Sequence, residues 1–205
     1  MKKNPYPGKF IVFEGLDGSG QSTQAKLLKD FLIKKGYKVH LTKEPTTNSK
    51  VAPKIRKALN KLSKISPQTL QELFAQDREE HLKEDIIPAL KEDKFVISDR
   101  YFFSSFAYGG ADGLDLNWLI KINHEFLLPD LTFILKVRPK ICLQRIINRG
   151  REKTLFERES ILEKVLKNYL SLARKFKNVY TIDGERPIKE VASQIQKVVL
   201  SKLNF

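Results

Sequence analysis

Two spacings of apolar residues alternate along the chain. Short apolar runs rich in β-branched and aromatic side chains are typical of buried parallel strands. Such runs occur at residues 10–13, 38–42, 95–98, 131–137 and 179–182. Between them, apolar residues recur at three- and four-residue intervals, which predicts helices. The helical segments are 22–35, 55–62, 66–87, 102–110, 114–127, 141–148, 156–175 and the residues after Pro187. Strands that alternate with helices imply an α/β fold, in which helices flank a parallel five-stranded sheet in a three-layer sandwich.

The first strand runs into a glycine-rich turn, in the stretch FIVFEGLDGSGQST that begins at Phe10. A strand, such a turn and a helix start together form a phosphate cradle, because backbone N–H groups and the helix N-terminus face the anion. The Walker A pattern asks for Gly, four residues, Gly, Lys and Ser or Thr, and Gly15, Gly20 and Ser22 match it. Gln21 occupies the lysine position. The stretch predicts a P-loop NTPase fold whose nucleotide phosphate site consists of Gly15, Leu16, Asp17, Gly18, Ser19, Gly20, Gln21, Ser22 and Thr23.

The bulk composition narrows the remaining classes of protein. The chain has 205 residues, of which 41% are hydrophobic and 30% charged, so we expect one globular domain over residues 1–205. No apolar run approaches the ~20 residues of a membrane span. The single cysteine, Cys142, excludes an internal disulfide and suits a reducing cytosol, so we expect a cytoplasmic protein.

The net charge of +14 is spread over lysines on predicted helix faces. That scatter suits the binding of polyanionic nucleotides better than it suits a groove for a duplex, so we expect no nucleic-acid partner. The histidines are too scattered to indicate a zinc cluster.

Six short stretches carry a more particular signal. They are FEGLDGSG from Phe13, KEP from Lys43, LFAQDR from Leu73, DRYFFSSFAY from Asp99, LPDLT from Leu128 and NYL from Asn168. In this order they closely resemble the thymidylate kinase family, over almost the whole chain. Many kinases share the phosphate loop, whereas Phe-x-x-x-Arg on a helix, combined with Asp-Arg-Tyr and Ser-x-Ala-Tyr, is more specific to this family.

The resemblance implies that the acceptor is dTMP. Phe74 and Arg78 lie four residues apart and share one helix face, and in the family such a pair stacks on thymine and donates hydrogen bonds to its ring. Arg56 and Arg100 resemble the clamps for the acceptor monophosphate, a task that suits the planar guanidinium fork. Tyr108 resembles an aromatic residue that crowds the 2′ position of the sugar and favours deoxyribose. The other acceptor-binding residues that the resemblance implies are Glu44, Ser104 and Ser105.

The resemblance also implies the donor side of the reaction. Asp17 matches an acid that reaches the acceptor sugar and phosphate, and Arg145 matches a residue that packs against the adenine of ATP. Ser22 and Asp99 resemble the groups that hold Mg²⁺. We expect a short mobile lid at about residues 149–156 to close over the phosphates. Relatives form homodimers, so we expect a homodimer and no membrane partner.

Two departures from the family concern positive charge at the transferring phosphoryl group. Gln21 brings no charge, and the lid has Thr154-Leu155-Phe156-Glu157 where the family usually has Asp-Arg-x-Glu. If the chain is a kinase, another cation must compensate, because phosphoryl transfer depends on positioning and electrostatic stabilisation. The candidate cations are Arg149, Arg151 and Lys153, with Lys136 near the end of the fourth strand as another.

We therefore predict an ATP- and Mg²⁺-dependent kinase that converts dTMP to dTDP. Its predicted catalytic residues are Asp17, Arg100, Arg149, Arg151 and Lys153. One alternative is a diverged nucleoside monophosphate kinase with another acceptor. A second alternative is a nucleotide-binding paralogue that has lost most catalysis and acts as a sensor or partner. The acceptor residues favour an enzyme, whereas the altered donor site favours the paralogue.

Overall fold

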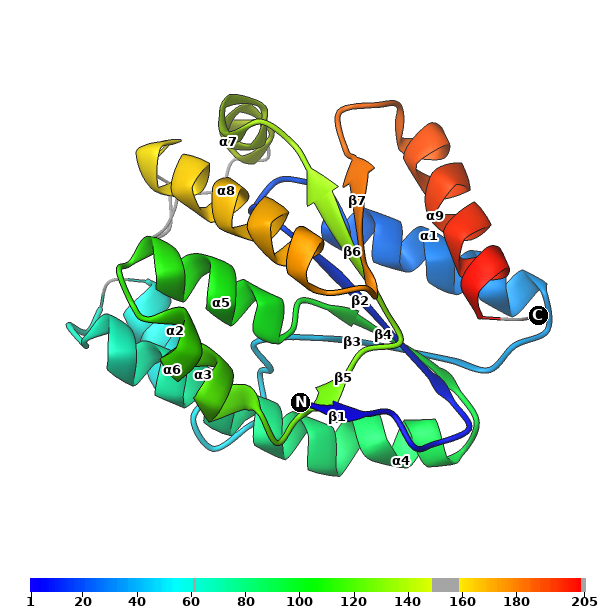
Figure 1. The fold of residues 1–205 in the computed structure, drawn as a ribbon, viewed down its shortest axis with the longest axis horizontal. Coiled ribbons are helices and arrows are strands. Elements are labelled where there is room, and N and C mark those ends of the chain that lie inside the picture. The colour runs from blue at the N-terminus through cyan, green and yellow to red at the C-terminus, as the bar shows by residue number, and fades with distance from the viewer. Residues whose placement is uncertain (61, 149–158, 204–205) are drawn as a thin grey trace.

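The structure is a computed structural model that describes residues 1–60, 62–148 and 159–203. Its centre is a sheet of five parallel strands in the order β3-β4-β2-β6-β7 (Figure 1). The strands are β2 (Lys9–Gly15), β3 (Val39–Lys43), β4 (Phe95–Asp99), β6 (Leu131–Lys136) and β7 (Val179–Asp183). The predicted parallel five-stranded sheet is therefore confirmed, and each predicted run overlaps one strand.

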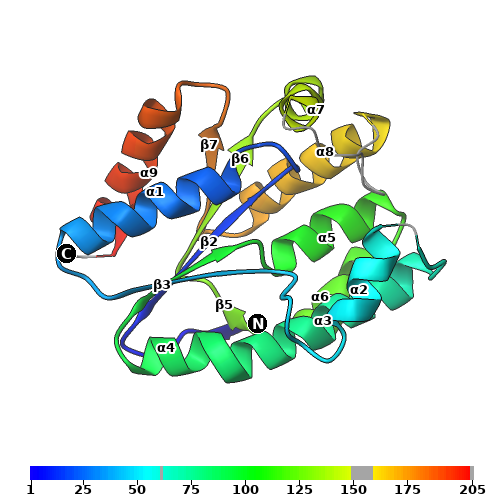
Figure 2. The ribbon, with the colours of Figure 1, turned by 180° about the vertical axis from the view of Figure 1, so that it is seen from behind.

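Helices cover both faces of this sheet. The helices are α1 (Gln21–Lys34), α2 (Ala52–Leu59), α3 (Pro67–His81), α4 (Ile87–Lys91), α5 (Phe102–Ala111), α6 (Leu116–Asn123), α7 (Pro139–Ile147), α8 (Glu159–Lys175) and α9 (Ile188–Lys202). On one face α1 and α9 lie together, and on the other α4, α5 and α8 contact the strands (Figures 1 and 2). α3 packs against α2, α5 and α6 farther from the sheet. The α/β architecture is the one that the alternation of strands and helices predicts.

The middle strand β2 is buried on both faces, which explains its continuous apolar run. Successive side chains of a strand point to opposite faces. Phe10 and Val12 join the core on the side of α5 and α8, whereas Ile11 and Phe13 join the core on the side of α1 and α9. Because both faces of this strand pack against an apolar core, none of its positions faces solvent and favours a polar residue.

The helix predicted to stop before Pro88 continues to Lys91. It begins as predicted, where the Ser66 hydroxyl accepts a hydrogen bond from the N–H of Thr69 at 3.0 Å. A π-helical turn over Leu82–Ile86 then changes the bonding, and the N–H of Ile87 donates to the carbonyl of Leu82. Pro88 therefore falls in the first turn of α4, where a missing N–H costs nothing.

The helix predicted over residues 114–127 is shorter than expected. α6 begins after Asp115, whose carboxylate accepts a hydrogen bond from the N–H of Trp118 at 2.9 Å. It ends at Asn123, and the chain then forms the short strand β5 (Leu127–Leu128), which pairs in parallel with β1 (Lys2–Lys3). The partner of β5 comes from the N-terminus, so no local pattern could predict it.

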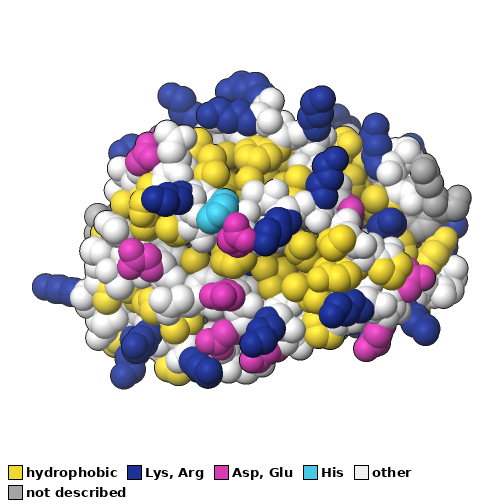
Figure 3. Space-filling view, turned by 60° about the horizontal axis from the view of Figure 1, so that its bottom comes forward, with side chains coloured by type: hydrophobic (Ala, Val, Ile, Leu, Met, Phe, Trp, Pro, Cys, Tyr) yellow, Lys and Arg dark blue, Asp and Glu magenta, His cyan; other side chains and the backbone are white. Residues whose placement is uncertain are grey.

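The strand pairing brings polar residues to the carboxyl edge of the sheet. Lys43 pairs with Asp99, and Asp99 pairs in turn with Phe13, directly before the phosphate loop. Ligands of open α/β sheets bind at this edge. Among the helices that the structure describes, none is long and apolar enough to cross a membrane. On the face in Figure 3, lysine and arginine side chains are dispersed among carboxylates and apolar areas.

Candidate active site

The phosphate loop joins β2 to α1, as the motif predicts. Gly20 has a φ of 101° and directly precedes Gln21, the first residue of α1. This left-handed conformation favours glycine. At Gly18 a Cβ atom would lie 2.5 Å from the carbonyl oxygen of Cys142, so glycine is needed where the loop packs against α7. The first N–H groups of α1 have no carbonyl partner within the helix, which makes this end a site for phosphate oxygens.

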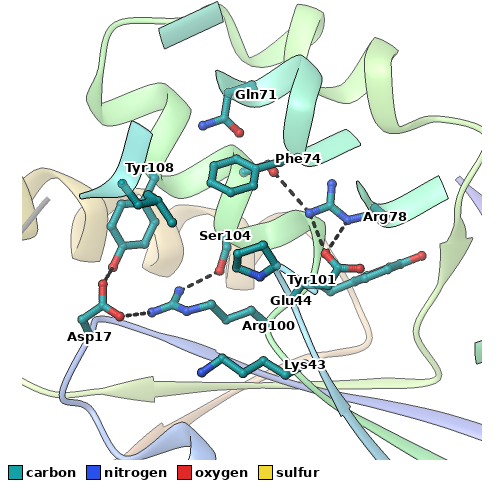
Figure 4. Close-up of a pocket in the computed structure, with 13 residues that line it drawn as sticks. Asp17, Lys43, Glu44, Gln71, Phe74, Arg78, Arg100, Tyr101, Ser104 and Tyr108 are labelled. Atoms are coloured by element: carbon teal, nitrogen blue, oxygen red, sulfur yellow. Dashed lines mark hydrogen bonds and ion pairs between the residues drawn. The ribbon is translucent and has the colours of Figure 1, made fainter. Parts of the chain in front are cut away.

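A cavity of about 210 Å³ opens beside this loop, between β3, α3 and α5 (Figure 4). Leu59, Phe74 and Tyr108 form apolar parts of its wall, and the guanidinium groups of Arg78 and Arg100 also line it. A partly apolar cavity with two fixed cations suits a flat anionic ligand. It brings together most of the predicted acceptor residues, namely Glu44, Phe74, Arg78, Arg100, Ser104, Ser105 and Tyr108.

Arg78 is held rigidly in the wall of this cavity. Its side chain is only 3% exposed, and Nε and Nη2 both donate to Glu44 Oε2, at 2.9 and 2.8 Å. Nη1 donates to Asn123 and Nη2 to Ser105 Oγ. The guanidinium also lies 5.2 Å from the ring centre of Tyr101, a cation–π contact. The sequence predicts Arg78 and Ser105 here, but it gave no role to Asn123.

Glu44 is itself supported by a buried histidine. His81 Nδ1 lies 3.1 Å from Glu44 Oε1, and its Nε2 lies 2.6 Å from Thr42 Oγ1 and 3.3 Å from Asp85. Burial alone would lower the pKa of His81, but the hydrogen bond to Glu44 and the negative charges of Glu44 and Asp85 raise it above its ordinary value. His81 and Arg78 thus both contact the buried carboxylate of Glu44.

Gln71 is a polar cavity residue that sequence reasoning missed. It is 1% exposed, lines the cavity, and lies one turn before Phe74 on α3 (Figure 4). Neither its amide nitrogen nor its amide oxygen has a hydrogen-bond partner among the described residues. The sequence could have indicated it, because Gln71 follows the apolar Leu70 on the side of the predicted helix that faces the core. Buried polar groups are normally paired, so an unpaired amide in a cavity wall points to a ligand.

Arg100 connects the cavity to the phosphate loop. Its Nη2 donates to Asp17 Oδ1 at 2.9 Å, and its Nη1 donates to Ser104 Oγ at 2.8 Å. Tyr108 donates to the other oxygen of Asp17 at 3.2 Å. Asp17 belongs to the phosphate loop, so a guanidinium and a carboxylate face each other between the two ligand sites.

A buried carboxylate, Glu14, supports the start of α5 beneath Arg100. It accepts hydrogen bonds from the N–H groups of Tyr101 and Ser104 and from the hydroxyls of Ser104 and Tyr169. Burial raises the pKa of Glu14 to about 7, although Arg100 and these donors oppose the shift. These bonds fix Tyr101 and Ser104, at the start of α5, relative to β2.

Ser22 and Asp99, both predicted to hold Mg²⁺, meet at the edge of the sheet. The hydroxyl of Ser22 donates to Asp99 Oδ2, and Lys43 Nζ lies 3.3 Å from the same oxygen. Asp99 Oδ1 is buried and has no hydrogen-bond partner among the described residues. No cluster of three or more His, Cys, Asp or Glu side chains suited to a metal occurs in the described ranges. One hydroxyl and one carboxylate fit Mg²⁺, which takes its remaining ligands from phosphates and water.

Arg145 lies on the far side of the phosphate loop. Its guanidinium donates to the carbonyl oxygens of Ser19 and Gly184, both at 3.2 Å. A cavity of about 110 Å³ lies here, and Thr23 and Arg145 line it. The structure thus places a flat cation where the loop, α1 and the segment after β7 meet.

Some predicted site residues are not brought into these cavities. Arg56 is exposed on α2 and does not line the cavity of Figure 4. Lys136 is exposed at the end of β6. Arg149, Arg151 and Lys153 lie outside the described residues, so their predicted roles stay predictions. Conversely, Lys43 lines the cavity beside Asp99, although the sequence assigned it no role.

The phosphate loop meets a separate cavity, lined by two arginines, at the carboxyl edge of the parallel sheet. This arrangement defines a P-loop nucleotide-binding protein with room for a second ligand.

The family model for thymidylate kinase matches residues 13–195. A probable thymidylate kinase of Pyrococcus horikoshii is 47% identical, over 96% of this chain and 98% of its own length. A probable thymidylate kinase of Thermococcus gammatolerans is 43% identical, over 94% and 96% respectively. A thymidylate kinase of Caldicellulosiruptor saccharolyticus is 39% identical, again over 94% and 96%. The chain belongs to the thymidylate kinase family.

Proposed function

We propose that this chain transfers the γ-phosphoryl group of ATP to dTMP and releases ADP and dTDP. The observation that carries the proposal is the position of Arg100, which lines the acceptor cavity and pairs with Asp17 of the phosphate loop. Membership of the thymidylate kinase family favours this activity over a nucleotide-binding role without catalysis.

In this proposal the thymine ring stacks on Phe74, and Arg78 identifies it. A guanidinium carries five N–H groups. Arg78 donates two of them to Glu44, one to Asn123 and one to Ser105. One N–H on Nη1 is left without an acceptor among the described residues. Because the other contacts hold the group still, the remaining N–H is preorganised for a ring carbonyl. Thymine offers a carbonyl where cytosine carries an amino group, so this donor discriminates between them.

The sugar and the acceptor phosphate are assigned to the region where the cavity meets the loop. The hydroxyl of Tyr108 donates a hydrogen bond to the carboxylate of Asp17 there. Tyr108 takes the space beside the 2′ carbon, which favours deoxyribose over ribose. Arg100 lines this region, and its positive charge attracts the phosphate.

Phosphoryl transfer then depends on holding two nucleotides in line and on stabilising the charge that develops. The N–H groups of the loop hold the donor phosphates, and Arg100 draws the acceptor phosphate toward them. Ser22 and Asp99 would hold Mg²⁺. When bound, this ion neutralises charge on the donor phosphates. These residues supply position and electrostatics, and no covalent intermediate is needed.

Three further parts of the proposal come from the family resemblance. Arg145 is assigned to pack against the adenine of ATP. The segment 149–156 is assigned to close over the phosphates with Arg149, Arg151 and Lys153. A homodimer and a cytoplasmic location are expected, the first by resemblance to relatives and the second from the single cysteine.

A coupled assay of ADP release, with ATP and Mg²⁺ and with dTMP, dUMP, dCMP or AMP as acceptor, tests the proposal. We expect the highest kcat/KM with dTMP. Binding of dTMP without any turnover would instead indicate the nucleotide-binding paralogue. Faster turnover of another monophosphate would show a kinase with a different acceptor.

A further inference from the structure

The amide group of Gln21 gives a structural reason for the missing lysine of the Walker A motif. Gln21 is 6% exposed, and its amide lies between the Leu16 carbonyl and Ser19 Oγ on one side and the guanidinium of Arg100 on the other. Only with the nitrogen toward Leu16 and the oxygen toward Arg100 does the amide have suitable partners on both sides. The nitrogen then donates to Leu16 O at 3.0 Å, and the oxygen accepts from Arg100 Nε at 3.1 Å and Nη2 at 2.9 Å.

The backbone of Arg100 is fixed at the edge of the sheet. Its φ of 78° is left-handed, a conformation that a residue with a side chain seldom adopts. The N–H of Arg100 donates to the carbonyl of Phe13 at 2.8 Å, and its carbonyl accepts from Ser98 Oγ at 2.7 Å. These bonds anchor the start of the side chain between β2 and β4, next to the phosphate loop.

The guanidinium of Arg100 is held as firmly as its backbone. Besides Gln21, its acceptors are Asp17 at 2.9 Å, Ser104 at 2.8 Å and the Tyr169 hydroxyl at 3.4 Å. All five N–H groups of the guanidinium therefore have an acceptor. Two of them point at the single oxygen of Gln21, the only one of these acceptors on α1. Gln21 thus ties the cation to the helix start that holds the donor phosphates.

A lysine at position 21 would disturb this arrangement. An ammonium group has donors and no acceptor, so it would leave the Arg100 donors unpaired and add a like charge beside them. Among the four cations that the sequence indicated as candidates, Lys136 is the one that lies in the described part of the chain. It is exposed at the end of β6 and has no hydrogen bond or ion pair with the phosphate loop among the described residues.

We propose that Gln21 is a positioning residue for Arg100. Its amide oxygen holds the Arg100 guanidinium at the phosphate loop, and Arg100 supplies the positive charge that lysine supplies in the Walker A motif. The same cation then serves both the acceptor phosphate and the transferring phosphoryl group. The inference rests on the proposed kinase activity and adds the reason why this activity survives without the lysine.

Kinetics of position 21 variants test the proposal. Gln21→Met, which keeps the side-chain length and loses both the acceptor for Arg100 and the donor to Leu16, should lower kcat by about tenfold or more, or about 1.4 kcal/mol of barrier. Gln21→Lys, which restores the motif, should also lower kcat. In an Arg100→Ala background, Gln21→Met should change kcat by less than about twofold, because its effect passes through Arg100. Gln194→Met on the exposed face of α9 is the matched control, and it should match wild type.

Two results would overturn the proposal: a Gln21→Lys variant as fast as wild type or faster, or an equal effect of Gln21→Met with and without Arg100.

NMR of the arginine Nε–H groups in the free protein gives a readout independent of turnover. The Arg100 signal, identified by its loss in Arg100→Lys, should be protected from exchange in wild type and in Gln21→Glu, but not in Gln21→Met. If the Arg100 signal stays protected in Gln21→Met as well, Gln21 does not hold the guanidinium, and the proposal is wrong. Absence of turnover in wild type would instead count against the kinase activity.

Discussion

Replacing Gln71 by methionine should stabilise the free protein and weaken its binding of the acceptor nucleotide. The amide of Gln71 is buried, and neither of its polar atoms has a partner among the described residues. An unpaired buried polar group costs about 1–3 kcal/mol. Methionine keeps the length of the side chain and removes both polar atoms. We therefore expect the free energy of unfolding to rise by about 1–3 kcal/mol, which raises Tm by about 2–4 °C per kcal/mol in a chain of this size.

The same amide lines the acceptor cavity beside Phe74, where the edge of a bound base can supply the missing hydrogen bonds. A base that pairs with the amide recovers the cost on binding. Removal of the amide should therefore weaken dTMP binding by a similar free energy, which is about 5- to 150-fold in Kd. Opposite changes in stability and affinity are the signature of a polar group kept for a ligand.

Isothermal titration with dTMP and thermal unfolding without ligand measure the two effects. Gln76→Met is the matched control, because Gln76 lies on the exposed side of the same helix. It should change neither quantity appreciably. If Gln71→Met leaves the Kd for dTMP unchanged, the amide does not contact the acceptor. If the variant is less stable than wild type, the amide has a partner in the free protein.

Four further outcomes test the assigned roles. Phe74→Ala should weaken dTMP binding by about 1–3 kcal/mol in titration, the usual value for base stacking, and an unchanged Kd would remove the stacking role. Arg78→Ala should reduce the preference for dTMP over dCMP in the same titrations, and unchanged selectivity would contradict its role in reading the ring. Asp99→Asn should raise the Mg²⁺ concentration needed for half-maximal ADP release, whereas an unaltered Mg²⁺ dependence would exclude it as a ligand. Burial raises the pKa of Glu14 from 4.5 to about 7, so the folded protein binds this proton more tightly than the unfolded chain does. The contribution of Glu14 to stability therefore falls as the pH rises from about 4.5 to about 7, and Glu14→Gln should remove that slope from a plot of Tm against pH. Parallel plots for wild type and variant would be inconsistent with the raised pKa.

Local patterns were sufficient for most of the fold. A strand buried on both faces needs a continuous apolar run, so the run at residues 10–13 identified β2 without any tertiary information. The phosphate loop was equally visible, because its glycines and Ser22 are contiguous in the sequence. The pairing of β1 with β5 was not visible, since two short segments from distant parts of the chain form it.

The candidate site could be predicted only in part. Phe74 and Arg78 came from a family resemblance, and their position on one helix face made that resemblance physically plausible. Gln71 and Asn123 carry no motif, because their importance depends on the cavity and on the guanidinium that they face. The contact of Gln21 with Arg100 joins two elements far apart in the sequence. A motif comparison could therefore report a missing lysine but could not identify the cation beside it.

Cys142 is a native chemical probe for movement of α7, the helix that packs against the phosphate loop. It is the only cysteine, it is fully buried, and its carbonyl oxygen is the atom that allows only glycine at position 18. Burial raises the pKa of its thiol to about 12, so at pH 8 very little of it is the reactive thiolate. An alkylating reagent therefore reacts at an appreciable rate only after α7 moves and exposes the thiol. Labelling of this native thiol reports how often α7, the helix that packs against the loop at Gly18, leaves the core, with no engineered probe required.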